Sequence, residues 1–253
     1  MALLGGKTQR HYEVLLEALK DGVLAITGRR LEPRQCITDF EAALMIAIRA
    51  AFPQTRSYGC YFHFCSSLYR KIQDLGLQVA YRRNEDLKDC VRRIMAIGYL
   101  PLAHVRGSFD NLRNDPATVR LVADFPHFNE FLDYFQITYL NGNLFPPCLW
   151  NVHQRPMAQR TNNAVESFHR RWNAQIGRAH PSLWAVIRRM KKEGKRTESS
   201  LAKALRGDRP PRIKRKWRRL ERRIDILNAS LRDGGHTLAE YWAAVVYVTH
   251  EFH

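Results

Sequence analysis

The chain lacks any hydrophobic run that approaches 18 residues, and its N-terminus has no apolar stretch long enough for a signal peptide. Neither a membrane-spanning helix nor secretion is therefore expected. The five cysteines are an odd number at irregular spacing, and no Cys-x-x-Cys pair exists. This pattern argues against a disulfide framework, so we expect free thiols in a reducing compartment, the cytoplasm or the nucleus.

Acidic residues are scarce: the sequence has 24 Asp and Glu against 41 Lys and Arg, which gives a net charge of +17. Such an excess predicts an anionic partner and says little about the fold. The hydrophobic fraction of 45% over 253 residues is sufficient for a real core, in one large domain or two small ones. No internal repeat is evident.

The positive charge is concentrated in residues 188–223, which hold 17 basic and 4 acidic residues, a local excess of 13. Neutralisation of phosphates by these side chains would give salt-sensitive, largely sequence-independent binding. The alternative is a set of solvated basic helix faces with no partner. The residues expected to contact a DNA backbone are Arg188, Arg189, Lys191, Lys192, Lys195, Arg196, Lys214, Arg215, Lys216, Arg218 and Arg219.

Hydrophobic periodicity predicts an α/β segment at the start of the chain and a helical segment after it. In the first segment, a strand remnant at 1–4 and strands at 34–38 and 56–60 alternate with helices at 9–20, 40–52 and 61–75. The second segment is predicted to contain helices at 84–100, 117–124 and 128–139. An apolar C-terminal helix over 237–252 is expected to dock on the body of the protein.

The string Cys36-Ile37-Thr38-Asp39-Phe40-Glu41 places Asp39 where a buried strand is followed by a helix. Functional residues of open α/β sheets gather at the carboxyl ends of strands, so Asp39 is a candidate functional residue. The spacing also fits a capping box, with Thr38 as the N-cap and Glu41 reaching back. Asp39 would then only be a first-turn acid favoured by the helix dipole.

Between the carboxylate motifs lies a Cys-x-x-His string, in which Cys60 and His63 share one helical face. A structural zinc ion needs four ligands, and no second pair has suitable spacing, so zinc is not expected. We expect Cys60 to pack in the interior and His63 to support the site or contact a substrate.

A third string runs from Arg160 to Asn173 and reads as a helix that starts at Thr161. Its apolar stripe comprises Val165, Phe168, Trp172 and Ile176. The opposite strip carries Asn162, Asn163, Glu166, His169, Arg170 and Asn173. A carboxylate flanked by amides and a histidine is typical of a metal site; the alternative is that Glu166 only pairs with Arg170 at i+4.

Together, the Thr-Asp-Phe-Glu, Cys-x-x-His and Thr-Asn-Asn-x-x-Glu strings resemble the MULE (Mutator-like element) transposase family. The resemblance extends to roughly Lys192 and includes Pro181-Ser182-Leu183-Trp184. It implies an RNase H-like domain that cleaves and transfers DNA strands with an Asp-Asp-Glu site for Mg²⁺ or Mn²⁺. Asp39 would be the second acid and Glu166 the third. A nuclear location and a helical insertion between these acids are also typical of such proteins.

The first acid of that family lies upstream of the segment that begins here at Met1, and Asp21 is a poor substitute. We therefore expect weak or absent Mg²⁺ or Mn²⁺ binding and a chain that is inactive alone. Two functions follow: a transposase-derived DNA-processing domain, or a decayed or domesticated protein that binds nucleic acid or a protein partner without catalysis. Homo-oligomers are compatible with both.

The expected fold class is α/β, a partial RNase H-like (DDE transposase) domain with a large all-helical insertion. The expected segments are a truncated RNase H-like part (1–66), a helical insertion (67–155), the helix with the third acid (156–187), a basic nucleic-acid-binding tract (188–235) and a docking helix (236–253).

Overall fold

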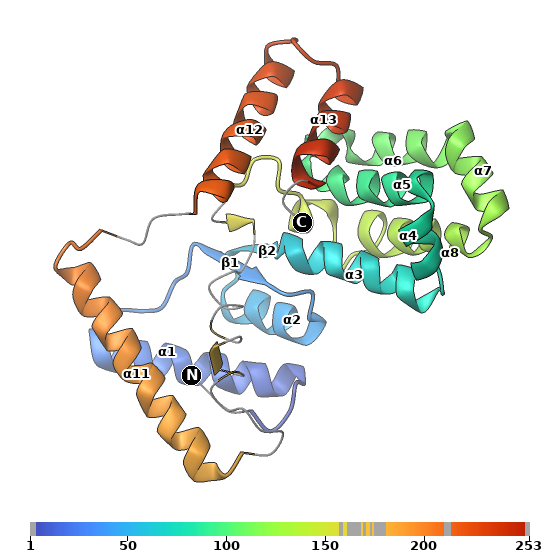
Figure 1. Ribbon diagram of the computed structural model, residues 1–253. Helices are drawn as coiled ribbons and strands as arrows, with labels where there is room; N and C mark the ends of the chain where they lie inside the picture. The colour runs from blue at the N-terminus through green and yellow to red at the C-terminus, as the bar shows by residue number, and fades with distance from the viewer. Residues whose placement is uncertain are drawn as a thin grey trace. The chain divides into compact units, whose positions relative to one another are not determined.

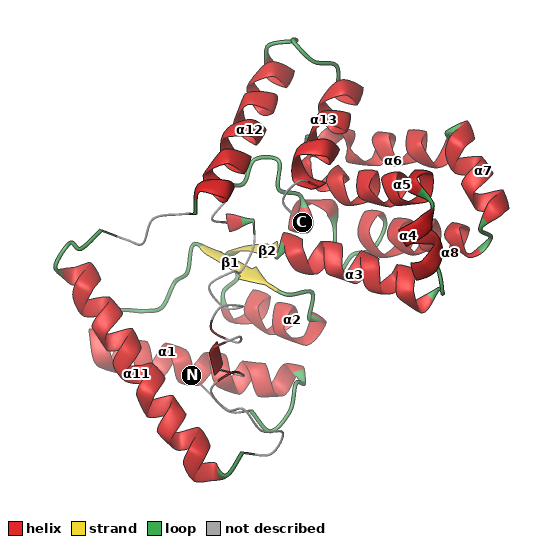
Figure 2. Ribbon diagram, in the orientation of Figure 1, coloured by secondary structure: helices red, strands yellow, loops and turns green. Residues whose placement is uncertain are grey.

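The structure is a computed structural model that describes residues 4–156, 159–160, 168, 171–172, 174, 181–209 and 214–250. The chain divides into two units. The larger unit comprises Leu4–Thr161 and Arg218–His253, and the smaller unit comprises Met1–Leu3 and Asn162–Trp217. The described chain is mostly helical, with one small parallel sheet in the larger unit (Figures 1 and 2).

The sheet consists of β1 (Gln35–Thr38) and β2 (Arg56–Gly59), which run parallel with Thr38 opposite Gly59. The helix α2 (Ala42–Ala51) connects them. Met45, Ala47 and Ile48 form the buried face of α2. This strand–helix–strand unit is the α/β part of the described chain, and its strands lie where the sequence predicts them.

The first helix, α1 (Gln9–Thr27), packs on α2 through Tyr12 and Leu16. It runs seven residues past the predicted end at Lys20, because Gly22 is tolerated within the helix. The helix ends at Gly28, which adopts φ 65° and donates its N–H to Leu24 O at 2.8 Å. Asp21 therefore lies inside a helix and does not follow one.

A helical body follows the sheet in the larger unit. Its elements are α3 (Tyr61–Asp74), α4 (Gln78–Arg83), α5 (Glu85–Ala96), short 3-10 helices at Ile97–Tyr99 and Leu102–His104, α6 (Val105–Asn114), α7 (Pro116–Asp124), α8 (His127–Phe135), a π-helix (Gln136–Leu140) and α9 (Pro147–Trp150). The segments predicted at 84–100, 117–124 and 128–139 are helical, each in a shorter or broken form. α4 and α6 were not predicted.

Aromatic packing holds this body together. The rings of Phe64 and Trp150 stack with their centroids 4.7 Å apart and their planes 5° from parallel. Tyr139 meets Phe64 edge-on at 5.1 Å. Such pairs contribute about 0.5–1.5 kcal/mol each beyond the burial of their area. They fix α3, which begins directly after β2, against the later part of the chain.

The C-terminal helices are α12 (Arg215–Arg232) and α13 (Leu238–His250). α13 packs on α5, with Val245 fully buried (Figure 1). The Tyr241 hydroxyl donates to Tyr99 O at 2.9 Å, and Trp242 Nε1 donates to Arg93 O at 3.0 Å. In α12, Leu220 and Ile224 form the buried stripe.

In the smaller unit, the long helix α11 (Leu183–Leu205) begins with Ser182 as its N-cap, whose hydroxyl accepts from Ala185 N at 3.3 Å. No residue of α11 is buried among those described. None of the described helices in either unit combines the length and apolar character needed to cross a bilayer.

Candidate functional site

The carboxyl ends of β1 and β2 meet at one edge of the sheet, because the strands are parallel and Thr38 pairs with Gly59. Asp39 follows β1 directly, and Cys60 follows β2 directly. The Cys60 N–H donates to Thr38 O at 2.8 Å, which ties the two strand ends together. Residues that follow the two strands are thus brought close in space although they are 21 positions apart in the sequence.

Asp39 and His63 meet at this edge. His63 lies in the first turn of α3, and its Nδ1 is 3.0 Å from Asp39 Oδ1. The His63 side chain is 24% exposed, although its Nδ1 is buried, and the Asp39 side chain is 43% exposed. Among the described residues Nδ1 has no hydrogen-bond partner, so its contact with Asp39 is a close approach without hydrogen-bond alignment.

The capping-box interpretation of Thr38 and Glu41 is wrong. Thr38 belongs to β1 and is buried, and α2 begins at Ala42 with Glu41 at the N-cap position. Glu41 does not cap the helix with its side chain; its Oε1 accepts from the Tyr12 hydroxyl at 2.6 Å. Burial and this bond raise the pKa of Tyr12 to about 12. Asp39 is therefore held by the strand end and not by the first turn of α2.

Glycine and aromatic packing set the position of the chain around Asp39. The Phe40 ring lies directly against Gly59, where an added Cβ would be 2.5 Å from Phe40 Cζ. The same ring meets Phe145 at 5.3 Å between centroids. Cys60 is fully buried at the N-cap of α3 and forms no disulfide. The peptide on each side of the site is thus fixed by close contact.

Two buried arginines support this edge, and sequence reasoning missed both. Arg155 is 6% exposed and donates from its two terminal nitrogens to Gly59 O at 2.9 Å and Leu149 O at 2.7 Å. Its guanidinium lies 4.5 Å from the centre of the Tyr58 ring. Burial lowers the pKa of Arg155 to about 10. Arg155 thereby joins the end of β2 to α9.

Arg160 continues the same support. It is 3% exposed and donates from Nε to Arg155 O at 2.9 Å, while its own carbonyl accepts from Tyr61 N at 2.8 Å. That bond fixes the first residue of α3, two positions before His63. Arg155 and Arg160 precede the Thr161-Asn162-Asn163 string in the sequence. The hydrophobic periodicity of that segment did not indicate that either arginine is buried.

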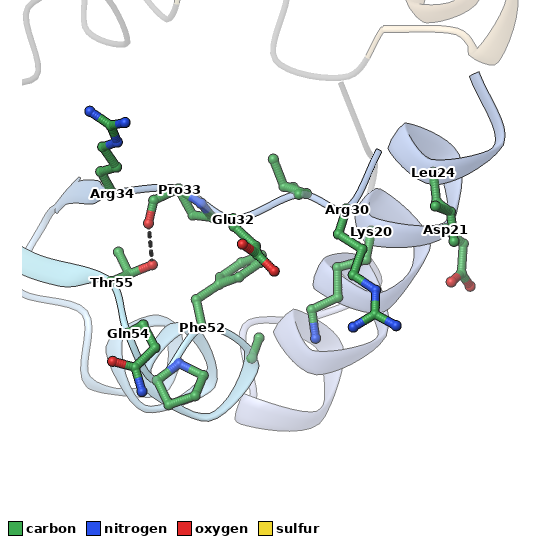
Figure 3. A pocket seen from close by; sticks show the side chains of 13 residues that line it. Lys20, Asp21, Leu24, Arg30, Glu32, Pro33, Arg34, Phe52, Gln54 and Thr55 are labelled. Atoms are coloured by element: carbon green, nitrogen blue, oxygen red, sulfur yellow. Dashed lines mark hydrogen bonds between the residues drawn. The ribbon is translucent and has the colours of Figure 1, made fainter. Parts of the chain in front are cut away.

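A cavity of about 610 Å³ lies at the opposite edge of the sheet (Figure 3). Pro33 and Arg34 precede β1 and Thr55 precedes β2, so this cavity is at the amino ends of the strands. Thr55 Oγ1 donates to Pro33 O at 2.5 Å across it. Its lining mixes cations and acids, including Lys20, Arg30, Asp21 and Glu32. It is therefore separate from the Asp39 edge and favours neither sign of ligand charge.

The predicted third acid cannot be compared with Asp39. Asn162, Asn163, Glu166 and His169 lie outside the described residues. Of that string the structure describes the Phe168 and Trp172 rings, which stack at 5.9 Å as expected for two members of one apolar stripe. Arg171 donates to Glu193 Oε1 at 3.2 Å, which links the string to α11 within the smaller unit.

The predicted phosphate-contacting residues lie on α11 and at the start of α12. In α11, Arg188, Lys191, Lys192 and Lys195 recur at helical spacing and share one face, and all four are exposed. None of the four forms an ion pair with another described residue. Ala185, Arg188, Arg189 and Lys192 line a hollow of about 430 Å³. The α11 cations are therefore available to an anionic ligand.

The remaining predicted contacts are Arg196 of α11 and five residues that flank Trp217 in the sequence. All six are exposed, the five being Lys214, Arg215, Lys216, Arg218 and Arg219. Lys216 Nζ lies 4.6 Å from the centre of the Trp217 ring, so this tryptophan packs against a neighbouring cation and is only half-buried.

The described residues alone do not fit a site for Mg²⁺ or Mn²⁺. Within the described ranges, no three His, Cys, Asp or Glu side chains lie together closely enough to hold a metal ion. These hard cations require several oxygen ligands. At the Asp39 edge the neighbouring acid, Glu41, is bound to Tyr12. No catalytic step through such an ion follows from these residues.

Comparison with known proteins identifies one family. The family model of the MULE transposase domain matches residues 1–67, which span α1, β1, α2, β2 and the start of α3. Neither the curated proteins nor the solved structures yield a match. The matched segment contains Asp39, Cys60 and His63. The resemblance to MULE transposases is thus confirmed over residues 1–67.

Proposed function

We propose that this protein is a transposase-derived DNA-binding protein that contacts the phosphate backbone and does not cut DNA on its own. The observation that carries the proposal is the exposed face of Arg188, Lys191, Lys192 and Lys195 on α11, which no described acid neutralises. The MULE match at the start of the chain supplies the class of anionic partner, because transposases act on DNA.

The binding mechanism is electrostatic. Each Lys or Arg that contacts a phosphate releases condensed counterions, so affinity falls steeply as salt rises. The exposed cations at Lys214, Arg215, Lys216, Arg218 and Arg219 extend the set of residues available for such contacts. Neither group contains an arrangement that reads base edges, so binding depends little on sequence.

We further propose that β1, α2 and β2 are part of a partial RNase H-like domain. A parallel strand–helix–strand unit with an acid directly after its first strand supports this fold. Asp39 and Glu166 would be surviving members of the family's acidic cluster, with His63 beside Asp39. Loss of catalysis is supported by the engagement of Glu41, the neighbouring acid, with the Tyr12 hydroxyl.

One observation favours a second candidate function, metal-dependent DNA cleavage. The Asp39 carboxylate is 43% exposed at the carboxyl edge of the sheet, where an enzyme would place it. In that case Asp39 and Glu166 would be the two acids that hold Mg²⁺ or Mn²⁺, as the resemblance to the family implies.

The test of the DNA-binding proposal measures the affinity of the full chain for a fluorescent duplex over a series of salt concentrations. The triple variant Arg188→Gln, Lys191→Gln, Lys192→Gln removes three cations from one face. The plot of log affinity against log salt has a negative slope. We expect the magnitude of this slope to decrease by about 2–3, since each lost phosphate contact removes roughly 0.9.

A matched control removes the same charge elsewhere. Arg10→Gln, Arg29→Gln, Arg120→Gln changes three exposed arginines of the larger unit. The control should keep the slope of the unmodified protein. Equal slopes in both triple variants would show that only net charge matters and would contradict a specific role for α11.

A further inference from the structure

A second cavity in the larger unit lies at the junction of α3, α4, α5 and α13. Its volume is about 730 Å³, within the range of sites that take a small ligand. α3 supplies one wall, with residues 61, 62, 65, 66, 69, 70 and 73, and α5 supplies another with residues 88, 92, 95 and 96. Both sets recur at helical spacing, so each helix presents one continuous face to the cavity.

The lining combines aromatic rings with cations. Phe62, Tyr69 and Tyr81 contribute rings, and the Tyr69 and Tyr81 rings meet edge-on at 5.4 Å. Arg70, Lys88 and Arg92 contribute positive charge, and the described lining contains no acid. Lys88 is partly compensated, because its Nζ lies 2.8 Å from Glu85 Oε1 just outside the cavity. The exposed Arg70 forms no ion pair with a described residue and is the main cation of the site.

One lining residue of the cavity, Phe62, is the chain neighbour of His63, which approaches Asp39. The Phe62 side chain is 45% exposed, and its ring meets the His63 ring edge-on at 5.5 Å. His63 in turn approaches Asp39 at 3.0 Å. A strand of nucleic acid that passes Asp39 would therefore encounter Phe62 and Arg70 within one to two turns of α3.

We propose that this cavity binds an unpaired nucleotide of a DNA strand, with the base stacked on Phe62 or Tyr69 and a phosphate held by Arg70. Base–aromatic stacking beside a basic groove is how proteins hold single strands without reading sequence. A paired duplex has no free base face to offer these rings, so the site distinguishes unpaired from paired DNA. The inference rests on the proposed function for the identity of the anionic polymer.

The test uses a fluorescein-labelled thymidine hexamer and the full chain, with affinity measured by anisotropy. Phe62→Ala should weaken hexamer binding about fivefold or more, as expected from the loss of one stacking contact. Phe62→Tyr keeps the ring and should bind like the unmodified protein. Arg70→Gln should also weaken binding, whereas Arg120→Gln, an exposed arginine of α7, should not.

The outcomes separate this inference from the DNA-binding proposal. The Arg188, Lys191, Lys192 triple variant should lose duplex affinity and keep the sensitivity of hexamer binding to Phe62→Ala. Absence of duplex binding with Phe62-dependent hexamer binding would refute the α11 proposal alone. Duplex binding with no hexamer binding, or hexamer binding unchanged by Phe62→Ala, would overturn the cavity inference.

Discussion

The position of Asp39 depends on neighbouring residues that have no reactive side chain. The backbone of Gly59, at the end of β2, touches the ring of Phe40, the residue after Asp39. The Phe40 ring is also enclosed by Tyr139 at 6.0 Å and Phe145 at 5.3 Å. Because Phe40 is held on several sides, a side chain at position 59 cannot be accommodated without movement of the peptide that carries Asp39.

Gly59→Ala should therefore destabilise the protein. The added Cβ would lie 2.5 Å from Phe40 Cζ, and the ring has little room to retreat. Overpacking of this kind costs about 1–3 kcal/mol in the free energy of unfolding. Urea unfolding followed by circular dichroism would measure the loss.

Gly107→Ala is the matched control for this change. Gly107 lies within α6, and an added Cβ would meet nothing within 4 Å. Alanine is the better helix former by about 0.5–1 kcal/mol, so this variant should be as stable as the unmodified protein or more stable. Similar losses in both variants would show that Gly59 has no special packing role.

The sequence predicted some of these residues and not others. Asp39 and His63 were candidates because their residue types and spacing are visible in one string each. Their approach to 3.0 Å depends on the parallel pairing of β1 with β2, which no single string contains. Arg155 was missed because a buried arginine that donates to Gly59 O and Leu149 O has the same letter in the sequence as an exposed one.

At the scale of elements, the sequence indicated best those helices with strong start or stop signals. Asn84 caps α5 by accepting from Leu87 N at 2.8 Å, and Asp115 with Pro116 starts α7. α6 was missed because Gly107 and Ser108 weaken its helix propensity. Burial of Val105, Phe109 and Leu112 on one face outweighs that weakness, and it depends on tertiary contacts.

The docking of α13 contains a titratable contact. His153 Nδ1 lies 2.8 Å from Tyr99 O and 3.4 Å from the hydroxyl of Tyr241 on α13. Burial lowers the pKa of His153 below its ordinary value near 6.5, although the bond to Tyr99 opposes this, and Arg160 and Arg232 add to the lowering. As pH falls, the unfolded chain takes up this proton before the folded chain does.

His153 should therefore make the protein less stable in mild acid. Its contribution is fully present above about pH 6.5 and is lost as pH falls below that value. We expect the drop in unfolding free energy from pH 7.5 to 5.5 to be smaller in His153→Gln than in the unmodified protein. Equal drops in the two proteins would contradict a role for His153.

At the scale of the whole molecule, the sequence alone determines the charge of the protein but does not show which distant residues meet in space. The net charge of +17 and its concentration in residues 188–223 follow from the sequence alone. Four of these cations, Arg188, Lys191, Lys192 and Lys195, lie on one exposed face of α11. Assembly of a metal site is different, because it requires acids from distant parts of the chain to meet. Asp39 is supplied by the sheet edge, and the described residues around it add His63 and no second available carboxylate.

The full chain should accordingly fail to nick supercoiled DNA when Mn²⁺ is added, because the described residues place one exposed carboxylate at the sheet edge. A pair of divalent ions that stabilises both the attacking and the leaving oxygen requires several oxygen ligands. Millimolar Mn²⁺ should also leave the melting temperature unchanged, since an ion that binds only the folded state would raise it. Gel analysis of plasmid relaxation and a thermal-shift measurement check the two expectations.

Asp39→Asn and Glu166→Gln are the matched controls, and both should behave like the unmodified protein. Mn²⁺-dependent nicking that disappears in both variants would establish that the two acids act together, and the protein would then be a nuclease and not only a DNA-binding protein.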